Sequence, residues 1–237
     1  NESWIENFQN FLVKDTALSR MTANKYAYAI RLALNKAVRD NLILKNPALT
    51  VKGITVPETE KVYLTETEIQ RLAKVKIAGK LGAEVRKGFL FCCFTGLRVS
   101  DIKTLTWADI EKDTLQLKKR QQKTGRFVYI PLNNNAWSLI NDNTIHKLTE
   151  LVFPLIGTTG TNTNQYLGPW AERAGVQKTI GWHTARHTFA TLTLEHGADF
   201  FTVSKLLGHT KTATTAVYTK ATDKLKREAV NALPDIE

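Results

Sequence analysis

The segment GFLFCCFTGLRVSD, residues 88–101, is the most informative part of the chain for its fold. Its first half, residues 88–94, is strongly apolar and predicts a helix buried in the core of a domain. The Thr95-Gly96 pair stops this helix. Arg98 follows at once, so the sequence places a cationic side chain at a turn between two helices. Asp101 lies three residues further on, where its carboxylate can orient the Arg98 guanidinium.

Further helices are predicted on both sides of this segment. Upstream, residues 64–69 (LTETEI) contain the strongest helix start, because Thr65 and Glu68 have the spacing of a capping box. Downstream, Gly208 occupies the position of a C-cap glycine and places His209 just past a helix end. The other downstream helices are expected at residues 133–139, 164–174, 183–195 and 199–207.

A β-hairpin is predicted between the upstream and downstream helices. Residues 114–118 (TLQLK) alternate polar and apolar side chains, which is typical of a strand. Residues 127–130 (FVYI) follow a Lys-Thr-Gly turn and predict the second strand, with Lys123 near the tip of the hairpin. The expected fold class is therefore mainly α with a small β-sheet (α+β).

The N-terminal 45 residues carry apolar side chains at helical spacing. Thr22 is predicted as the N-cap of the second helix in this region, and the Asn46-Pro47 pair ends that helix. Residues 47–63 show no periodicity and contain glycine and proline, which is typical of a linker. We therefore expect a small helical domain, a linker and a larger domain, at residues 1–50, 51–62 and 63–237.

The first residue of the chain is Asn1 and not Met. We therefore expect the sequence to be a fragment that lacks an upstream module.

The composition favours a polyanionic partner. The 237 residues include 33 Lys and Arg against 22 Asp and Glu, so the net charge is +11. Basic side chains release the counterions condensed on nucleic acid, which indicates a nucleic-acid partner, although an ordinary basic protein could have the same surplus. The hydrophobic fraction of 43% argues against global disorder.

No membrane segment or resident cofactor is predicted. The longest strongly apolar run, residues 89–94, is far shorter than the ~20 residues that cross a bilayer, and the N-terminus has no signal-peptide core. Cys92 and Cys93 are adjacent in this run and predict small buried thiols rather than a disulfide. No second cysteine pair and no suitable histidine spacing suggest zinc. We therefore expect no metal, no cofactor and a cytoplasmic location.

Six residues form a pattern suited to attack on a phosphodiester. An arginine guanidinium matches two phosphate oxygens at once, and histidine and lysine can donate to others. A lysine can also protonate a leaving oxygen. A tyrosine can act as the nucleophile, although a phenol with a pKa of about 10 needs a base or a strongly positive site. In chain order, the six are Arg98, Lys123, His183, Arg186, His209 and Tyr218.

Each of these residues, taken alone, has an ordinary structural explanation. Either arginine could form a surface ion pair, His209 could cap a helix and Tyr218 could be a packing residue. Lys123 has nearby rivals that could instead steer phosphate. These rivals are Lys118, Lys119 and Arg120.

The spacing of His183 and Arg186 puts both side chains on one face of a helix. His187 lies four residues after His183, which raises the possibility of a metal pair. Arg186 between the two histidines would repel a cation, so a buried histidine bonded to the backbone is the favoured interpretation of His187.

The segments TGLRVSD, QKTGR, HTARHTF, LLGH and AVYTK together resemble the tyrosine recombinase (phage-type integrase) family over about residues 3–231. The resemblance is to mobile-element integrases of the kind found in Bacteroidetes-like bacteria. It implies a site-specific recombinase that cleaves and rejoins double-stranded DNA through a 3′-phosphotyrosyl bond, without metal or ATP. Tyr218 would be the nucleophile and Lys123 the general acid. The scissile phosphate would be bound by Arg98, His183, Arg186 and His209.

The resemblance also implies two DNA-binding domains and an assembly of several copies. Residues 1–50 would be part of a helical core-binding domain, and residues 63–237 would be the catalytic domain. The tail after Tyr218 resembles a segment that docks on a neighbouring subunit, which implies a homo-tetramer, or a dimer, on paired sites.

Three other functions are consistent with parts of the pattern. A type IB topoisomerase shares the phosphate chemistry, and a regulator that has lost catalysis would share the DNA binding. A metal-dependent nuclease would need clustered carboxylates, but Asp101, Asp109 and Asp113 lack the spacing of ligands.

Overall fold

The computed structural model describes residues 1–57 and 60–209 of the 237. The chain divides into two compact units, Asn1–Thr59 and Glu60–Glu237. Residues 51–57 and 60–64 form neither helix nor strand. No described helix is long and apolar enough to cross a membrane.

The N-terminal unit contains helices α1 (Glu2–Lys14) and α2 (Arg20–Arg39), followed by a short 3-10 turn. The prediction that Thr22 caps α2 was wrong. Ser19 is the N-cap, because its Oγ accepts the Thr22 N–H at 3.2 Å. Both residues carry a hydroxyl that can cap, and the helix begins at the earlier one.

Helix α2 also ends earlier than predicted. It stops at Arg39, and Asn41 then takes a left-handed backbone with φ of 57°. Asn46 caps the following 3-10 turn, not α2. Its Nδ2 donates to the carbonyl of Arg31 at 3.1 Å and to Oδ1 of Asn35 at 2.7 Å. The turn is therefore fastened against the middle of α2.

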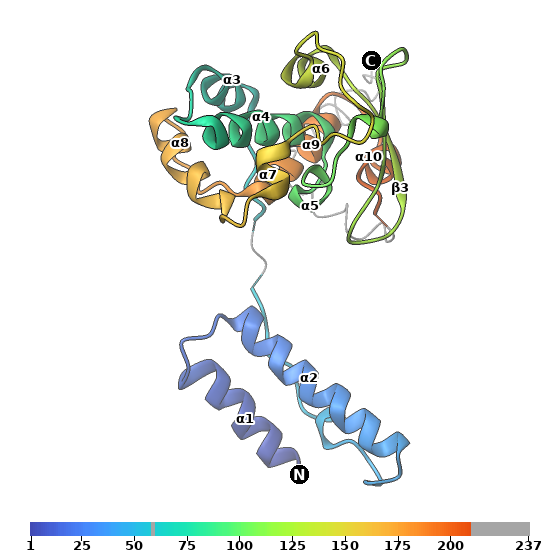
Figure 1. Cartoon of the computed structure of the whole chain (residues 1–237). Helices are drawn as coiled ribbons and strands as arrows, with labels where there is room; N and C mark the ends of the chain where they lie inside the picture. Colours follow the sequence, from blue (N-terminus) through green and yellow to red (C-terminus); the bar gives the residue numbers. More distant parts are fainter. Residues whose placement is uncertain (58–59, 210–237) are drawn as a thin grey trace, which may run out of the picture. The chain divides into compact units, whose positions relative to one another are not determined.

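The larger unit is built around one buried helix, α4, in the middle of the unit (Figure 1). Its apolar half is buried from Gly88 to Cys93, with Phe94 partly buried, and it packs against α6, α7 and α9. The prediction of a buried helix that stops at Gly96 is confirmed. The helices of this unit are α3 (Glu66–Lys74), α4 (Lys80–Thr95), α5 (Val99–Ile102), α6 (Asn134–Ile140), α7 (Pro154–Thr158), α8 (Leu167–Arg173), α9 (Trp182–Glu195) and α10 (Phe200–Leu207).

The predicted helix starts and positions in this unit are largely confirmed. Thr65 caps α3, and Thr65 and Glu68 form both bonds of the capping box. The predicted helix at 164–174 is a 3-10 turn followed by α8, and α7 was not predicted. Cys92 and Cys93 are buried free thiols, and burial raises the pKa of both.

A three-stranded antiparallel sheet completes the unit, so the fold class is α+β as expected. Its strands are β1 (Ile110–Glu111), β2 (Gln116–Arg120) and β3 (Phe127–Pro131), in that order. The predicted hairpin is β2 and β3, with Lys118 opposite Tyr129 and Arg120 opposite Phe127. These four side chains are exposed, and the alternate residues are buried.

Two glycines end the helices that lie next to the candidate site. Gly96 ends α4 and Gly208 ends α10, both in the left-handed region with φ of 67° and 65°. A Cβ on Gly96 would lie 2.5 Å from Phe189, and one on Gly208 would lie 2.7 Å from Val128. Glycine is therefore needed at both ends, for backbone conformation and for space.

Candidate active site

Arg98 lies at the N-terminus of α5, immediately after the end of α4. Its side chain is only 14% exposed, and its Nη1 lies 3.9 Å from Oδ2 of the fully buried Asp101. That separation is an ion pair but is too long for a hydrogen bond. Nη1 is buried and has no hydrogen-bond partner within residues 1–57 and 60–209. A buried cationic donor without a partner is costly, so this nitrogen is suited to receive an anion.

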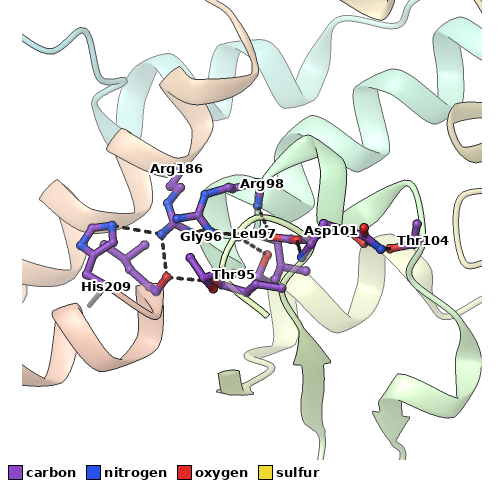
Figure 2. A network of polar contacts seen from close by, with 12 residues as sticks. Thr95, Gly96, Leu97, Arg98, Asp101, Thr104, Arg186 and His209 are labelled. Carbon is purple, nitrogen blue, oxygen red and sulfur yellow. Dashed lines mark hydrogen bonds and ion pairs between the residues drawn. The ribbon is translucent and has the colours of Figure 1, made fainter. Parts of the chain in front are cut away.

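Arg186 lies on α9 and is 4% exposed. Its Nη1 donates to the carbonyl of Gly96 at 2.6 Å, and its Nη2 donates to the carbonyl of Leu207 at 2.6 Å. These carbonyls lie at the C-terminal ends of α4 and α10, where the helix dipoles concentrate negative charge. The Arg186 guanidinium, carried by α9, therefore joins the ends of α4 and α10 (Figure 2).

His209 contacts the same guanidinium, with its Nε2 3.1 Å from Nη2 of Arg186. Arginine can only donate, so Nε2 must accept, and the ring proton lies on Nδ1. Burial lowers the pKa of His209 to about 4, and the charges of Arg186 and Arg98 act in the same direction. The ring is therefore neutral near neutral pH and has a donor N–H on the side away from Arg186.

His183 lies in the first turn of α9, on the exposed side of the helix. Partial burial of its ring lowers its pKa, followed by the charges of Arg186, Arg98 and Lys123. Three of the predicted cations thus act on one imidazole although their positions span residues 98 to 186. The structure brings together the five predicted site residues that it describes.

Lys123 is exposed in the turn that joins β2 to β3. The same buried carboxylate contacts both this turn and Arg98. Oδ1 of Asp101 accepts the backbone N–H of Gln122 at 2.9 Å, and its Oδ2 accepts the backbone N–H of Arg98 at 3.3 Å. Asp101 thereby fixes the first helix turn after Arg98 relative to the residue before Lys123.

The three basic residues that were considered beside Lys123 have different environments in the hairpin. Lys119 was wrongly considered as a phosphate-steering residue, because its Nζ is buried against Oδ2 of Asp109 at 2.8 Å and the carbonyl of Thr104 at 2.5 Å. Lys118 and Arg120 are exposed. Lys118 lies over the rings of Phe127 and Tyr129, and Nε of Arg120 donates to the Gly125 carbonyl at 3.0 Å.

His187 is half-buried on α9, and its ring centroid lies 6.5 Å from that of His183. Burial is the largest of the effects that lower its pKa to about 4. Within the described ranges, no group of three or more His, Cys, Asp or Glu side chains could hold a metal. Tyr218, the predicted nucleophile, lies outside the described residues, as does the tail after it.

Gln121 is a site residue that the sequence reasoning missed. It is 1% exposed, and its Nε2 donates to the carbonyl of Leu207 at 2.9 Å. The available signal was the alternation of the strand, which places Gln121 on the same face as Leu117 and Lys119, two residues before the predicted general acid.

A mainly helical unit that gathers fixed guanidinium groups, neutral imidazoles and a lysine is suited to an enzyme that transfers a phosphodiester. The comparisons with known proteins agree with this class. Residues 62–224 match the model of the phage integrase family, and residues 1–52 match that of the phage integrase SAM-like domain. The chain therefore belongs to the phage integrase family.

Individual relatives agree with the family. Tyrosine recombinase XerD of Oceanobacillus iheyensis is 27% identical over 225 residues, which cover 90% of this chain and 75% of that protein. The structure of the XerH site-specific recombinase in a post-cleavage complex with palindromic difH substrate has a TM-score of 0.78 and 19% identity, and the match covers 98% of this chain and 72% of that one.

The structure of the Tn1549 transposon integrase in complex with circular intermediate DNA has a TM-score of 0.71 and 20% identity. That match covers 95% of this chain and 84% of the integrase. The chain is accordingly a tyrosine-type site-specific recombinase. The alternatives of a topoisomerase or an inactive regulator are not favoured.

Proposed function

We propose that this recombinase cleaves and rejoins double-stranded DNA through a 3′-phosphotyrosyl intermediate, with Tyr218 as the nucleophile. The observation that supports the proposal best is the buried Nη1 of Arg98, which has no hydrogen-bond partner in the described part of the chain. It is accompanied by Arg186, His183, His209 and the exposed Lys123, whose mutual electrostatic effects indicate one site. A scissile phosphate is the anion that this buried nitrogen would bind.

The two arginines act on the charge that builds up on the phosphate in the transition state. Arg186 is held by two carbonyls before any substrate arrives, so its position costs no reorganisation. Removal of one such donor typically costs about 2.7–4 kcal/mol of transition-state stabilisation. Neutral His209 donates from Nδ1 to a phosphate oxygen and adds no further positive charge to a crowded site.

The strand-cleavage step exchanges one ester for another. The Tyr218 oxygen forms a bond to phosphorus while the bond from phosphorus to the 5′ oxygen breaks. Lys123 gives its proton to that leaving oxygen, and the phenol proton passes to the neutral ring of His183. Because a phosphodiester remains, a 5′ hydroxyl can reverse the step without ATP or a metal ion.

The exposed face of the hairpin is suited to contact DNA beside the scissile phosphate. Lys118, Arg120, Phe127 and Tyr129 form a cross-strand square of two cations and two rings. The net charge of +11 favours a polyanion more generally. The N-terminal unit, which matches the SAM-like domain, would supply a second DNA-binding surface as the core-binding domain.

The exchange of two duplexes breaks four strands, and each copy of the chain has one Tyr218. A homo-tetramer, with a dimer on each of two paired sites, therefore supplies the four nucleophiles. The family match and the likeness to a transposon integrase support a mobile genetic element as the source.

The test is the capture of a covalent adduct on nicked duplexes from a randomised pool. The wild-type chain should give an adduct that survives denaturant and forms in excess chelator, whereas Tyr218→Phe should give none at unchanged DNA affinity. The selected duplex then serves as substrate. An adduct from Tyr218→Phe, no adduct from the wild type on any duplex, or loss of the adduct in chelator contradicts the proposal.

A further inference from the structure

The buried side chain of Gln121 fastens the turn that carries Lys123. Its Oε1 accepts the hydroxyl of Thr124 at 2.8 Å, and its Nε2 donates to the carbonyl of Leu207 at 2.9 Å. Gln121 and Thr124 flank Lys123 on both sides. The backbone of Gln121 also closes the turn, because its N–H donates to Arg126 at 2.8 Å and its carbonyl accepts from Gly125 at 2.9 Å.

The Leu207 carbonyl is a shared contact between the turn and the rest of the site. It accepts from Nη2 of Arg186 as well as from Gln121. His209 lies two residues further on, and Gly208 between them leaves the space that Gln121 occupies. A Cβ on Gly208 would lie 2.8 Å from Oε1 of Gln121. The Leu207 carbonyl thus fixes the positions of three segments relative to one another, those that carry Lys123, Arg186 and His209.

The bond from Gln121 is not needed merely to satisfy this carbonyl. Leu207 already has a charge-assisted bond of 2.6 Å from Arg186, so its oxygen would not be left unpaired if Gln121 were absent. What the second bond adds is the position of the turn. Lys123 itself is exposed, and the backbone that carries it is held from the Gln121 side by this bond and from Gln122 by Asp101.

We propose that Gln121 is a positioning residue that sets the reach of Lys123 toward the leaving 5′ oxygen. The inference rests on the proposed function, in which Lys123 is the general acid. Gln121 touches no reacting atom and acts through the turn. Its loss should therefore weaken proton donation to the leaving group, while binding of the phosphate by the arginines continues.

A change of the leaving atom from oxygen to sulfur distinguishes a loss of proton donation from a loss of phosphate binding. In a substrate with sulfur in place of the bridging 5′ oxygen, the phosphorus–sulfur bond breaks and a thiolate leaves. A thiol has a pKa of about 8.5, so it departs as an anion without a proton from the enzyme. A defect in general acid catalysis should disappear on the sulfur substrate, whereas a defect in phosphate binding or folding should remain.

The experiment compares single-turnover cleavage of oxygen and sulfur versions of the duplex that the adduct assay selects. Gln121→Met keeps the length of the side chain and removes both of its hydrogen bonds. We expect it to cleave the oxygen substrate about 10-fold to 100-fold more slowly than wild type, and the sulfur substrate within about 3-fold. Gln122→Met loses only an exposed bond of 3.3 Å from its Nε2 to Oγ1 of Thr104 and keeps the backbone bond to Asp101, so it should stay close to wild type on both substrates.

Lys123→Ala is the reference for the proposed function. If the sulfur substrate does not restore cleavage by Lys123→Ala, the general acid is another group and the proposed function is wrong at that point. If it restores Lys123→Ala but leaves Gln121→Met equally slow on both substrates, Gln121 has only a structural role. Wild-type rates for Gln121→Met on the oxygen substrate also overturn the inference.

A second variant covers the case in which Gln121→Met does not fold, as judged by thermal unfolding and DNA affinity. Thr124→Val keeps the shape of the side chain and removes only its bond to Gln121. It should show a smaller loss on the oxygen substrate that the sulfur substrate restores. An equal loss on both substrates, or no loss, contradicts the inference.

Discussion

The proposed site has a buried part and an exposed part, and the two are held in different ways. The helix-end cluster, which consists of Gly96, Arg98, Arg186, Leu207 and His209, is mostly buried at the ends of α4 and α10. The hairpin turn, residues 121–126, exposes Lys123 and contacts the cluster through Gln121 and the Gln122 backbone.

This difference follows the two tasks of the reaction. Stabilising charge must be in place before the transition state forms, and it is most effective on groups that cannot reorganise. A proton donor must come within hydrogen-bond distance of an atom that moves away. Helix ends provide the first property, and a short turn on an antiparallel hairpin provides the second.

The largest expected effect lies within the helix-end cluster, at Arg186. Arg186→Lys keeps the positive charge but cannot donate to both Gly96 and Leu207 in the geometry of the guanidinium. We expect cleavage to fall by about 10²–10³-fold and the free energy of unfolding to fall by about 1–3 kcal/mol, because a buried carbonyl loses its donor. Chemical denaturation and single-turnover cleavage measure the two quantities.

Arg98→Lys is the matched control for that variant. Cleavage should fall by a similar factor, but the free energy of unfolding should not fall, because Nη1 of Arg98 has no hydrogen-bond partner in the described part of the chain. Equal destabilisation by the two substitutions would show that both arginines serve the fold alike. The proposed difference, in which carbonyls hold Arg186 and Nη1 of Arg98 is kept for a phosphate, would then be wrong.

Local signals in the sequence were sufficient for most of the fold. The Thr65–Glu68 capping box and the glycine after Thr95 act through neighbours in the chain, and both are where they were predicted. The sequence does not decide between Ser19 and Thr22, because either hydroxyl can cap, and the structure shows that Ser19 does.

The contacts that assemble the site depend on long-range packing. Gln121 and Leu207 are 86 positions apart, and Arg186 and Gly96 are 90 apart, so no local pattern relates them. The order of the motifs indicated which residues to consider. The order of the motifs could not show that backbone carbonyls hold Arg186. It also could not show that Arg98 has a buried nitrogen without a hydrogen-bond partner in the described part of the chain.

The next effect concerns two neighbouring lysines on β2. Lys119→Met leaves Asp109 without its partner in a largely buried ion pair, so we expect the free energy of unfolding to fall by about 2–4 kcal/mol. Lys118→Met removes an exposed charge and should change that quantity by less than about 0.5 kcal/mol. Thermal or chemical unfolding of the two variants gives the comparison.

DNA binding should rank the same two variants in the opposite order. Lys118→Met should weaken affinity and reduce the slope of log affinity against log salt by about 1, as expected for one lost phosphate contact. Lys119→Met should leave the slope unchanged in the folded protein. A reduced slope for Lys119→Met alone would mean that the buried face of the hairpin, and not its exposed face, contacts DNA.

The last expected effect appears only in acid and is a loss of stability that originates in two half-buried imidazoles, those of His187 and His209. The pKa of His187 and that of His209 are both lowered to about 4 from an ordinary value of 6.5, chiefly by burial. The unfolded chain therefore takes up these protons first as the pH falls. The stabilisation is complete above about pH 6.5 and is lost progressively toward pH 4. His187→Gln removes one of the two groups, so Tm should decline less steeply across this window than in wild type. An unchanged decline would mean that the sensitivity to acid comes from other groups, and that burial of His187 does not couple its protonation to folding.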